Sequence, residues 1–441
     1  MTRPIPPTVE ALPGLPPSLL PLLRAAAGDD RLALVGGAVR DLLLHRVHND
    51  PWLGVPDLDL VVEPAACGGD DAAADEGVAP AQRLAHRLCR AVGPDGVLYL
   101  QEHGAYGTVE LELQLPEGPL LLDLASARRE TYPQPGENPV VSFGRLGEDL
   151  ARRDFTINAI ALQLGGEADG ALADPHAGLA DLAARRLRFL HGASVRDDPT
   201  RVVRGARYAA RLGFELADDS RAQIAATLAA WPWAWRPGDP PAQAPPALAT
   251  RLRTELELLL ERESWILALA ALQRWGGLLL LDPALQSDRH WRRRLRRAAR
   301  LGLPLLPALL AVAAEPLAVA ERLQLPHRQH RLLMRFLALR QRLAALPPEA
   351  TGGRQAPGSW TAARWCDLLE EPGAAPEAVA LALAAGVGPP RPLLRWWLRW
   401  RHLGAGVSAA ELMAAEGLRP GPELGRRLRQ RRRERLERET T

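Results

Sequence analysis

The sequence predicts an α+β fold in which one β-sheet near the amino terminus is followed by helices over the rest of the chain. Strand-like segments lie in the first third, and Leu/Ala/Arg segments with apolar residues at three- and four-residue spacing begin at about residue 176. The composition, 47% hydrophobic and 24% charged over 441 residues, is that of a globular protein. Wholesale disorder and peptide-sized folds are therefore excluded, and the length suffices for about three domains.

Every fixed cation in the chain is a guanidinium. Lys and Arg together number 55 against 52 Asp and Glu, the net charge is +3, and no lysine is present. A lysine nucleophile, a Schiff base and a P-loop lysine are thus excluded, whereas arginines suit planar, bidentate recognition of phosphates and bases.

The cysteines and the amino terminus indicate the cell compartment. Cys67, Cys89 and Cys366 are far apart and lack the spacing of a zinc site or a disulfide framework. The first residues are proline-rich without a basic segment before an apolar one, and the leucine-rich runs are interrupted by Arg, Pro or Gly. We expect a soluble, cytoplasmic protein without a membrane span.

Five short segments rich in Val and Leu and bounded by Gly or Pro predict the strands of the sheet. They cover residues 31–37, 57–63, 96–103, 107–115 and 119–125. Clusters of Pro and Gly predict loops. These lie at 63–80, 231–246 and 346–359. The tryptophans of the second loop could stack on bases, but Pro-flanked tryptophans more often pack a loop against its neighbour.

The first segment that could take part in binding or catalysis is LVGGAVRDLLL at 34–44. It joins an apolar strand to a helix through Gly36 and Gly37. Two glycines let backbone N–H groups approach an anion, and a helix N-terminus favours negative charge. A triphosphate could bind there, near Arg40 and Asp41, although many such turns serve packing alone. The pattern matches neither the P-loop nor the dinucleotide-binding fingerprint.

The next segment, DLDLVVE, carries two acids on a predicted strand. Alternation points Asp57 and Asp59 to one side and Leu58 and Leu60 to the core. Carboxylates are hard ligands that suit magnesium, and two ions could share that side, unless the acids are simply the polar face of the strand. A third carboxylate could come from another strand. The candidates are Asp123, Glu110 and Glu112.

Two later segments concentrate arginines. In EDLARRDFTINAIAL at 148–162, Arg153 could hold a phosphate and Asp154 could orient Arg153 by ion pairing, or both could cap a helix; an apolar helical run is expected to follow. In RDDPTRVVRGARYAARLGF at 196–214, charged residues recur at three-residue steps on a predicted helix, which makes a charged stripe beside apolar residues. The stripe is either solvated or functional.

Together these segments resemble the bacterial-type (class II) tRNA nucleotidyltransferase/poly(A) polymerase family. GGAVRD, DLD, RRDFTINAIA, DPHAGLADLAARRLRFL and DDPTRVVRGARYAARLGF occur in the order and approximate spacing of that family between residues 30 and 280, and LMAAEGLRPGPELGRRL is similar to its tail. The resemblance implies a polymerase-beta-like nucleotidyltransferase head followed by an all-α neck, body and tail. The implied boundaries are an N-terminal extension at 1–29, head at 30–175, neck at 176–280, body at 281–390, and an Arg-rich, tRNA-contacting tail at 391–441.

The resemblance also implies an activity, which is template-independent addition of C and/or A to the 3′ end of tRNA from CTP and ATP, with two Mg²⁺ ions. The product could be CCA, CC alone or A alone, and a poly(A) polymerase is the alternative. Asp57 and Asp59 would be the catalytic metal ligands, and Arg253 and Glu255 would belong to a weaker, mainly structural neck motif. The implied nucleotide-binding residues are Gly36, Gly37, Arg40, Arg153, Asp198, Arg201, Arg204 and Arg207.

Base choice can be argued from donor and acceptor patterns. Cytosine and adenine both present an exocyclic amine beside an unprotonated ring nitrogen, so one carboxylate and one guanidinium can read either base. Asp198 and Arg201 supply that pair. Uracil and guanine present a carbonyl and a ring N–H instead, which the same pair rejects.

Overall fold

The computed structural model describes residues 15–52, 54, 58–64, 78–104, 107–165, 168–347, 360–371 and 373–438. The chain divides into two units. The head unit comprises Met1–Ala234, Pro245–Ala247 and Leu267–Trp275, and the helical unit comprises Trp235–Ala244, Leu248–Ile266 and Gly276–Thr441. The finer division into neck, body and tail stays a prediction.

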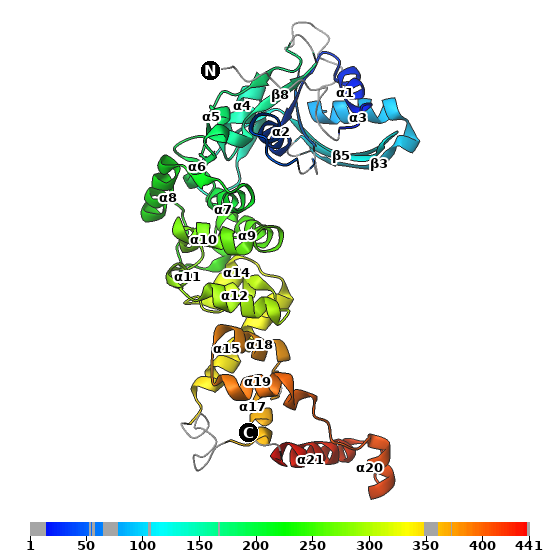
Figure 1. The fold of residues 1–441 in the computed structure, drawn as a ribbon, viewed down its shortest axis with the longest axis vertical. Helices are drawn as coiled ribbons and strands as arrows, with labels where there is room; N and C mark the ends of the chain where they lie inside the picture. Colours follow the sequence, from blue (N-terminus) through cyan, green and yellow to red (C-terminus); the bar gives the residue numbers. More distant parts are fainter. Residues whose placement is uncertain are drawn as a thin grey trace. The chain divides into compact units, whose positions relative to one another are not determined.

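A seven-stranded mixed sheet organises the head unit (Figure 1). Its order is β3-β4-β5-β2-β1-β8-β9, with β2 and β5 parallel and the other neighbours antiparallel. The five strands predicted from the sequence are confirmed as β1 to β5. The strands are β1 (Arg31–Val35), β2 (Leu58–Glu63), β3 (Val97–His103), β4 (Thr108–Leu115), β5 (Gly118–Ser126), β8 (Ala161–Leu164) and β9 (Leu172–Ala173).

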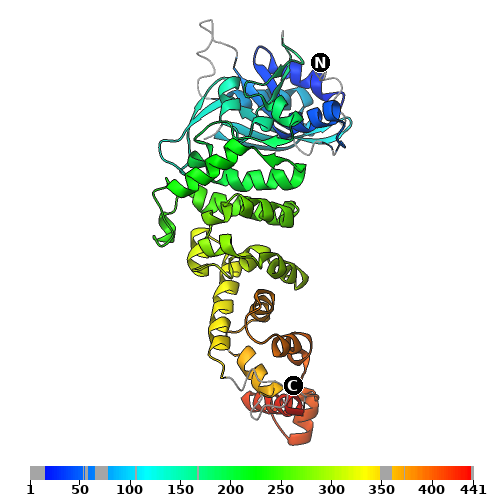
Figure 2. The same cartoon turned by 60° about the vertical axis from the view of Figure 1, so that its left-hand side comes forward.

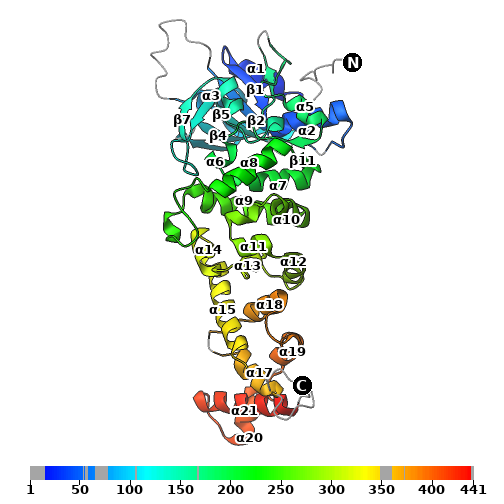
Figure 3. The same cartoon turned by 90° about the vertical axis from the view of Figure 1, so that its left-hand side faces the viewer.

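Helix α3 (Pro80–Val92) covers one face of this sheet, where it contacts β2, β4 and β5 (Figure 3). Proline at its first position suits a helix start, and Leu84 and Leu88, four residues apart, are fully buried against the strands. Helix α1 (Leu19–Ala27), in the segment predicted as an N-terminal extension, packs on α3 and β1. The acids of β2 and β5 lie on the opposite face.

Shorter elements complete the head unit. Two two-stranded sheets pair β6 with β7 and β10 with β11. Their bounds are β6 (Arg128–Thr131), β7 (Val140–Phe143), β10 (Arg186–Leu187) and β11 (Glu215–Leu216). The remaining helices are α2 (Gly37–His48), α4 (Leu146–Ala151), α5 (Gly178–Ala183), α6 (Ser194–Asp197), α7 (Thr200–Leu212), α8 (Asp218–Ala230) and most of α10 (Trp265–Arg274).

Two secondary-structure predictions are wrong. The apolar run expected to be helical forms a single 3₁₀ turn at Thr156–Asn158 and then β8, which pairs with β1 and β9. Burial on both faces of a central strand produces a continuous apolar run, which periodicity cannot distinguish from a buried helix. The region beyond residue 176 is also not wholly helical, because it contains the short strands β10 and β11.

The described part of the helical unit consists of α-helices and short 3₁₀ turns (Figure 2). Its core includes the contact between α15 and α18, where Phe336 and Val379 are fully buried. Arg322 is 1% exposed and donates to the carbonyls of Leu280 (2.9 Å) and Leu281 (3.0 Å). The helices are α9 (Thr250–Arg262), α11 (Pro283–Ser287), α12 (Trp291–Arg300), α13 (Leu305–Leu310), α14 (Pro316–Arg322), α15 (His327–Ala344), α17 (Ala362–Leu369), α18 (Pro376–Ala385), α19 (Pro390–Leu398), α20 (Ala409–Glu416) and α21 (Pro422–Arg438).

Two of the three tryptophans in the predicted loop at 231–246 pack into the protein. Trp233 and Trp235 are buried, and their indole N–H groups donate to the carbonyls of Arg196 (3.0 Å) and Pro240 (3.1 Å). Most of the other two predicted loops, and Cys67, lie outside the described residues. None of the helices in the described ranges is long and apolar enough to cross a membrane.

Candidate active site

The turn between β1 and α2 brings three of the predicted site residues together. Gly36 has φ +71°, and a Cβ atom on it would lie 2.8 Å from Asp59 Oδ2 and 3.4 Å from Arg153 Nη1. A side chain would therefore collide with the acid and would need a left-handed backbone that favours glycine. The predicted strand-glycine-helix turn is confirmed, and the backbone of Gly36 lies against a carboxylate and a guanidinium.

The strand register places a row of acids across the sheet. Asp59 on β2 is opposite Asp123 on β5, and Asp123 is opposite Glu110 on β4. Residues opposite one another point to the same face, while Leu58, Leu60 and Val62 alternate to the face that α3 covers. The sequence left three candidates for a third carboxylate, and the register makes Asp123 the direct neighbour of Asp59.

The donor chemistry of this row fits a divalent metal ion. Carboxylate oxygens are the hard ligands that Mg²⁺ prefers. Within the described ranges, no three His, Cys, Asp or Glu side chains already lie close enough to hold a metal. The second acid of the motif, Asp57, lies outside the described residues.

A buried acid that the sequence analysis missed orients both arginines of the Arg-Arg-Asp segment. Asp149 on α4 is fully buried, and its Oδ1 accepts hydrogen bonds from Arg152 Nε (2.9 Å) and Nη2 (2.7 Å). Its Oδ2 accepts one from Arg153 Nη2 (3.0 Å). The signal was an acid three and four residues before the arginines, which is the spacing of helical neighbours. Asp149 therefore fixes Arg153 beside Gly36.

The predicted pairing of Arg153 with Asp154 is wrong. Asp154 is 8% exposed; its Oδ1 accepts from Asn158 Nδ2 (3.1 Å), and its Oδ2 lies 3.4 Å from Arg204 Nη1. The chain bends at these two residues, and Asp154 Oδ1 also accepts the backbone N–H of Phe155 (2.8 Å). Asp154 thus links the segment to α7. Asp149, and not Asp154, orients Arg153.

Arg40 is also held by neighbours in the fold. Its guanidinium, 3% exposed, donates Nε and Nη2 to Asp41 (2.8 and 2.9 Å) and Nη1 to Asn158 Oδ1 (2.9 Å). It lies 5.5 Å from the ring centre of Tyr208 on α7. Burial raises the pKa of Tyr208 to about 12, and Asp154 adds to this effect. Arg40 therefore joins α2, the 3₁₀ turn and α7.

The predicted base-reading pair lies at the start of α7. Asp198 Oδ1 accepts from the backbone N–H (3.0 Å) and hydroxyl (2.6 Å) of Thr200, the first residue of the helix. Arg201 Nη2 donates to the backbone carbonyl of Arg152 (2.9 Å). Both residues are 3% exposed, so this part of the stripe is not solvated. The apolar face of α7 packs as expected, with Val202, Val203 and Ala206 buried.

Two residues near this pair were missed by the sequence analysis. Glu130 on β6 accepts the Tyr132 hydroxyl (3.0 Å) and lies 3.1 Å from Arg152 Nη1. Burial raises the pKa of Tyr132 to about 12; Glu130 and Asp198 act in the same direction, and Arg201 opposes them. Tyr132 is therefore neutral at physiological pH and lies in the electrostatic field of the predicted base-reading pair.

His191 adds a neutral imidazole to the same surroundings. Its Nε2 lies 3.4 Å from Arg201 Nη1. Burial lowers the pKa of His191 to about 4, and the charges of Arg201 and His176 lower it further. An uncharged ring can accept a hydrogen bond from a guanidinium without repelling it. No sequence signal singled out His191.

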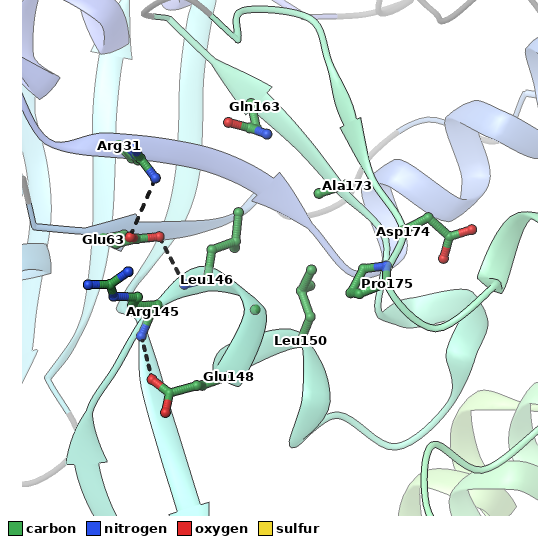
Figure 4. A pocket seen from close by; sticks show the side chains of 11 residues that line it. Arg31, Glu63, Arg145, Leu146, Glu148, Leu150, Gln163, Ala173, Asp174 and Pro175 are labelled. Carbon is green, nitrogen blue, oxygen red and sulfur yellow. Dashed lines mark hydrogen bonds and ion pairs between the residues drawn. The ribbon is translucent and has the colours of Figure 1, made fainter.

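A separate cavity of about 680 Å³ lies beside β1, β2 and α4 (Figure 4). Glu63 lines this cavity. Its Oε2 accepts from the N–H of Leu146 (2.9 Å), and its Oε1 lies 3.8 Å from Arg31 Nη1. Arg31 begins β1 and Glu63 ends β2, whereas Gly36 and Asp59 lie at the other ends of those strands. No predicted site residue lines this cavity.

The weaker neck motif lies in the helical unit, on α9. Glu255 is 9% exposed, and Arg253 donates to the carbonyl of Gln324 and lies 3.7 Å from Glu257. Arg253 thus links α9 to Gln324 within the helical unit, and the mainly structural role of the motif stays a prediction.

The head unit has a mixed sheet with an acid row beside a strand-glycine-helix turn. Arginines that buried acids hold in place flank this turn. Together these features define a polymerase-type nucleotidyltransferase head. A family model described as the poly A polymerase head domain matches residues 32–188. The CC-adding tRNA nucleotidyltransferase of Deinococcus radiodurans is 37% identical over 324 residues, which are 72% of this chain and 73% of that protein. The chain therefore belongs to the tRNA nucleotidyltransferase/poly(A) polymerase family.

Other relatives match over shorter stretches. The A-adding tRNA nucleotidyltransferase of Aquifex aeolicus is 40% identical over 186 residues, 42% of this chain and 19% of that protein. The A-adding enzyme of Halalkalibacterium halodurans is 37% identical over 185 residues, 42% of this chain and 36% of that protein. This chain thus spans well under half of these A-adding relatives.

Solved structures share the fold. An apo form of a CCA-adding enzyme has a TM-score of 0.67 at 23% identity, covering 97% of this chain and 94% of that chain. The Thermotoga maritima CCA-adding enzyme complexed with tRNA has a TM-score of 0.63 at 23% identity, with the same coverage of 97% and 94%. The likeness extends over both units.

Proposed function

We propose that the protein is a template-independent nucleotidyltransferase that adds C, A or both to the 3′ end of tRNA from CTP and ATP. In this reaction the RNA 3′-hydroxyl attacks the α-phosphorus, a phosphodiester bond forms, and pyrophosphate leaves. The observation that carries the proposal is the convergence of Gly36, Asp59 and Arg153 in the head of a chain of this family. A tRNA substrate places the protein in the cytoplasm.

Asp57 and Asp59 would hold two Mg²⁺ ions, with Asp123 as the adjacent acid. Held by these carboxylates, Mg²⁺ would supply the positive charge that lowers the pKa of the attacking hydroxyl and neutralises the leaving phosphates. Arg153 binds the phosphates of the nucleotide, because Asp149 holds its guanidinium beside the glycine turn. The triphosphate would bind at Gly36 and Gly37, where the N-terminus of α2 favours negative charge.

Asp198 and Arg201 would read the base, with Arg204 and Arg207 one and two turns further along α7. The carboxylate accepts the exocyclic amine of C or A, and the guanidinium donates to the adjacent ring nitrogen. Both groups are nearly excluded from solvent. A mismatched base would set its carbonyl against the carboxylate and its ring N–H against the guanidinium, and each buried polar group of the base left unsatisfied costs about 1–3 kcal/mol. Asp198→Ala should therefore admit UTP and GTP, and continued exclusion of both would contradict this role.

CC addition is the product that the comparisons favour. The similarity to the CC-adding enzyme extends over 72% of this chain, whereas that to the A-adding enzymes stops at 42%. The longer match includes residues beyond the head, where the neck is predicted. We therefore propose that the protein adds two C residues.

The deciding experiment supplies purified protein with tRNAs that end before CCA, after the first C and after CC, each with CTP, ATP or both. Growth of the first two primers with CTP alone supports CC addition, growth of the third with ATP supports A addition, and a long A tail supports poly(A) synthesis. Asp59→Ala and Asp57→Ala should abolish incorporation, and Glu112→Gln is the control, since Glu112 is opposite Leu121 and not an acid.

For RNA binding we propose the exposed arginines of α21. Several of its arginines hold the helix in place: Arg432 pairs with Glu370, and Arg427 and Arg431 pair with Glu416. Phosphate contacts would fall to the exposed ones that face solvent instead. These are Arg426, Arg429 and Arg438.

A further inference from the structure

The loop at 132–139, between β6 and β7, is held in place by backbone hydrogen bonds of Gly136. Gly136 is buried with φ +80°; its N–H donates to the carbonyl of Asp197 (3.1 Å), and its carbonyl accepts from the N–H of Ala247 (3.1 Å). Asp197 directly precedes the acid of the predicted base-reading pair. The loop and that pair are therefore joined through the backbone of one glycine.

Trp233, in the tryptophan-rich segment, packs at the contact between Gly136 and Asp197. It is 3% exposed, and its indole N–H donates to the carbonyl of Arg196 (3.0 Å), the residue before Asp197. The same edge of the ring lies against Gly136, where an added Cβ would be 2.8 Å from Trp233 Cδ1 and 3.4 Å from Nε1. One side chain thus contacts both the loop and the turn that leads to Asp198, and all of these residues belong to the head unit.

We propose that Trp233 is a positioning residue that fixes the loop at 132–139 against the 196–198 turn and thereby contributes to nucleotide selection. This inference rests on the proposed role of Asp198 and Arg201 in reading the base. The loop begins at Tyr132, whose electrostatic surroundings include both of them. A shift of the turn would move Asp198 relative to Arg201, because Arg201 is tied separately to the carbonyl of Arg152.

The geometry explains why an indole is needed. A phenyl ring keeps an aromatic side chain at this position, but it is smaller than the indole and leaves the buried carbonyl of Arg196 without its donor. A Cβ at Gly136 disturbs the same junction from the loop side, since it meets the ring and sits on a backbone that favours glycine. Two variants from different elements should therefore have the same effect.

Trp233→Phe and Gly136→Ala test the proposal, and Trp235→Phe is the matched control. Trp235 is 5% exposed and also donates its indole N–H to a backbone carbonyl, that of Pro240, but it belongs to the helical unit. Affinities for CTP, ATP, UTP and GTP are measured by calorimetry on the full chain, together with hydrogen exchange of residues 132–139 and thermal stability. We expect both test variants to speed exchange in the loop and to reduce discrimination between CTP and UTP about tenfold, and the control to do neither.

The inference is overturned if Trp233→Phe and Trp235→Phe change discrimination equally, or if Trp233→Phe lowers only the melting temperature. It also fails if the loop loosens while discrimination stays unchanged, since positioning would then have no consequence for selection. Incorporation into tRNA is measured separately. Wild-type protein that discriminates between nucleotides without extending tRNA would contradict the proposed function and leave the role of Trp233 supported.

Discussion

Replacing Asp149 by Asn tests whether a buried acid organises the arginines at the candidate active site. The carboxylate is fully buried and accepts three hydrogen bonds from Arg152 and Arg153. Removing one partner from a buried ion pair costs about 3–5 kcal/mol. Asn keeps one acceptor oxygen, and Arg152 keeps Glu130 at 3.1 Å, so we expect a loss at the lower end, about 3 kcal/mol of unfolding free energy.

The matched control is Asp50→Asn. Asp50 also makes a two-bond contact with an arginine, Arg185 (2.5 and 2.6 Å), but the two side chains are 27% and 43% exposed. Exposed pairs contribute about 0.2–1 kcal/mol. Urea unfolding followed by circular dichroism measures both variants, and nucleotide incorporation measures the consequence at the site, where Asp149→Asn should lower kcat/KM about tenfold or more. Equal destabilisation by the two variants, or an unchanged kcat/KM, would refute the reasoning.

Three further outcomes are expected. Gly36→Ala should abolish incorporation and destabilise the head by about 1–3 kcal/mol, because the new Cβ meets Asp59 on a left-handed backbone; incorporation and urea unfolding check this. Since the pKa of His191 is about 4 in the folded protein against 6.5 unfolded, only the unfolded chain takes up that proton between these values, so stability falls as the pH drops from 6.5 to 4; His191→Gln should flatten the fall in unfolding midpoint. Arg426→Ala should reduce the salt dependence of tRNA binding by about one unit of log–log slope, whereas Arg431→Ala, whose guanidinium is paired with Glu416, should change it less.

Local signals predicted the elements that carry the site. The glycines after an apolar strand identified the turn, and the alternation in β2 placed Asp59 away from the core, because both depend on neighbours in sequence. The choice of Asp123 over Glu112 depends on which strands pair and in which register. That information is held by contacts between distant segments, which periodicity does not encode.

The misses near the Arg-Arg-Asp segment have the same origin. Asp154 adjoins Arg153 in sequence, so ion pairing between them was the natural expectation. The structure instead ends α4 before the arginines and bends the chain at Arg153 and Asp154, so that Asp149 faces both arginines and Asp154 faces α7. Side-chain direction at a helix end decides the partner, and it depends on where the helix ends.

Fixing the arginines before substrate arrives has a consequence for binding. Ordering a free arginine side chain costs up to about 1.5–2 kcal/mol of rotamer entropy. Here Asp149 orders Arg153 and a backbone carbonyl orders Arg201 during folding, so this cost does not fall on nucleotide binding. Asp149 also cancels part of the positive charge that would attract a triphosphate. The head therefore relies on the direction of its N–H donors more than on net charge. A planar guanidinium holds its donors in fixed directions, and a lysine ammonium would not.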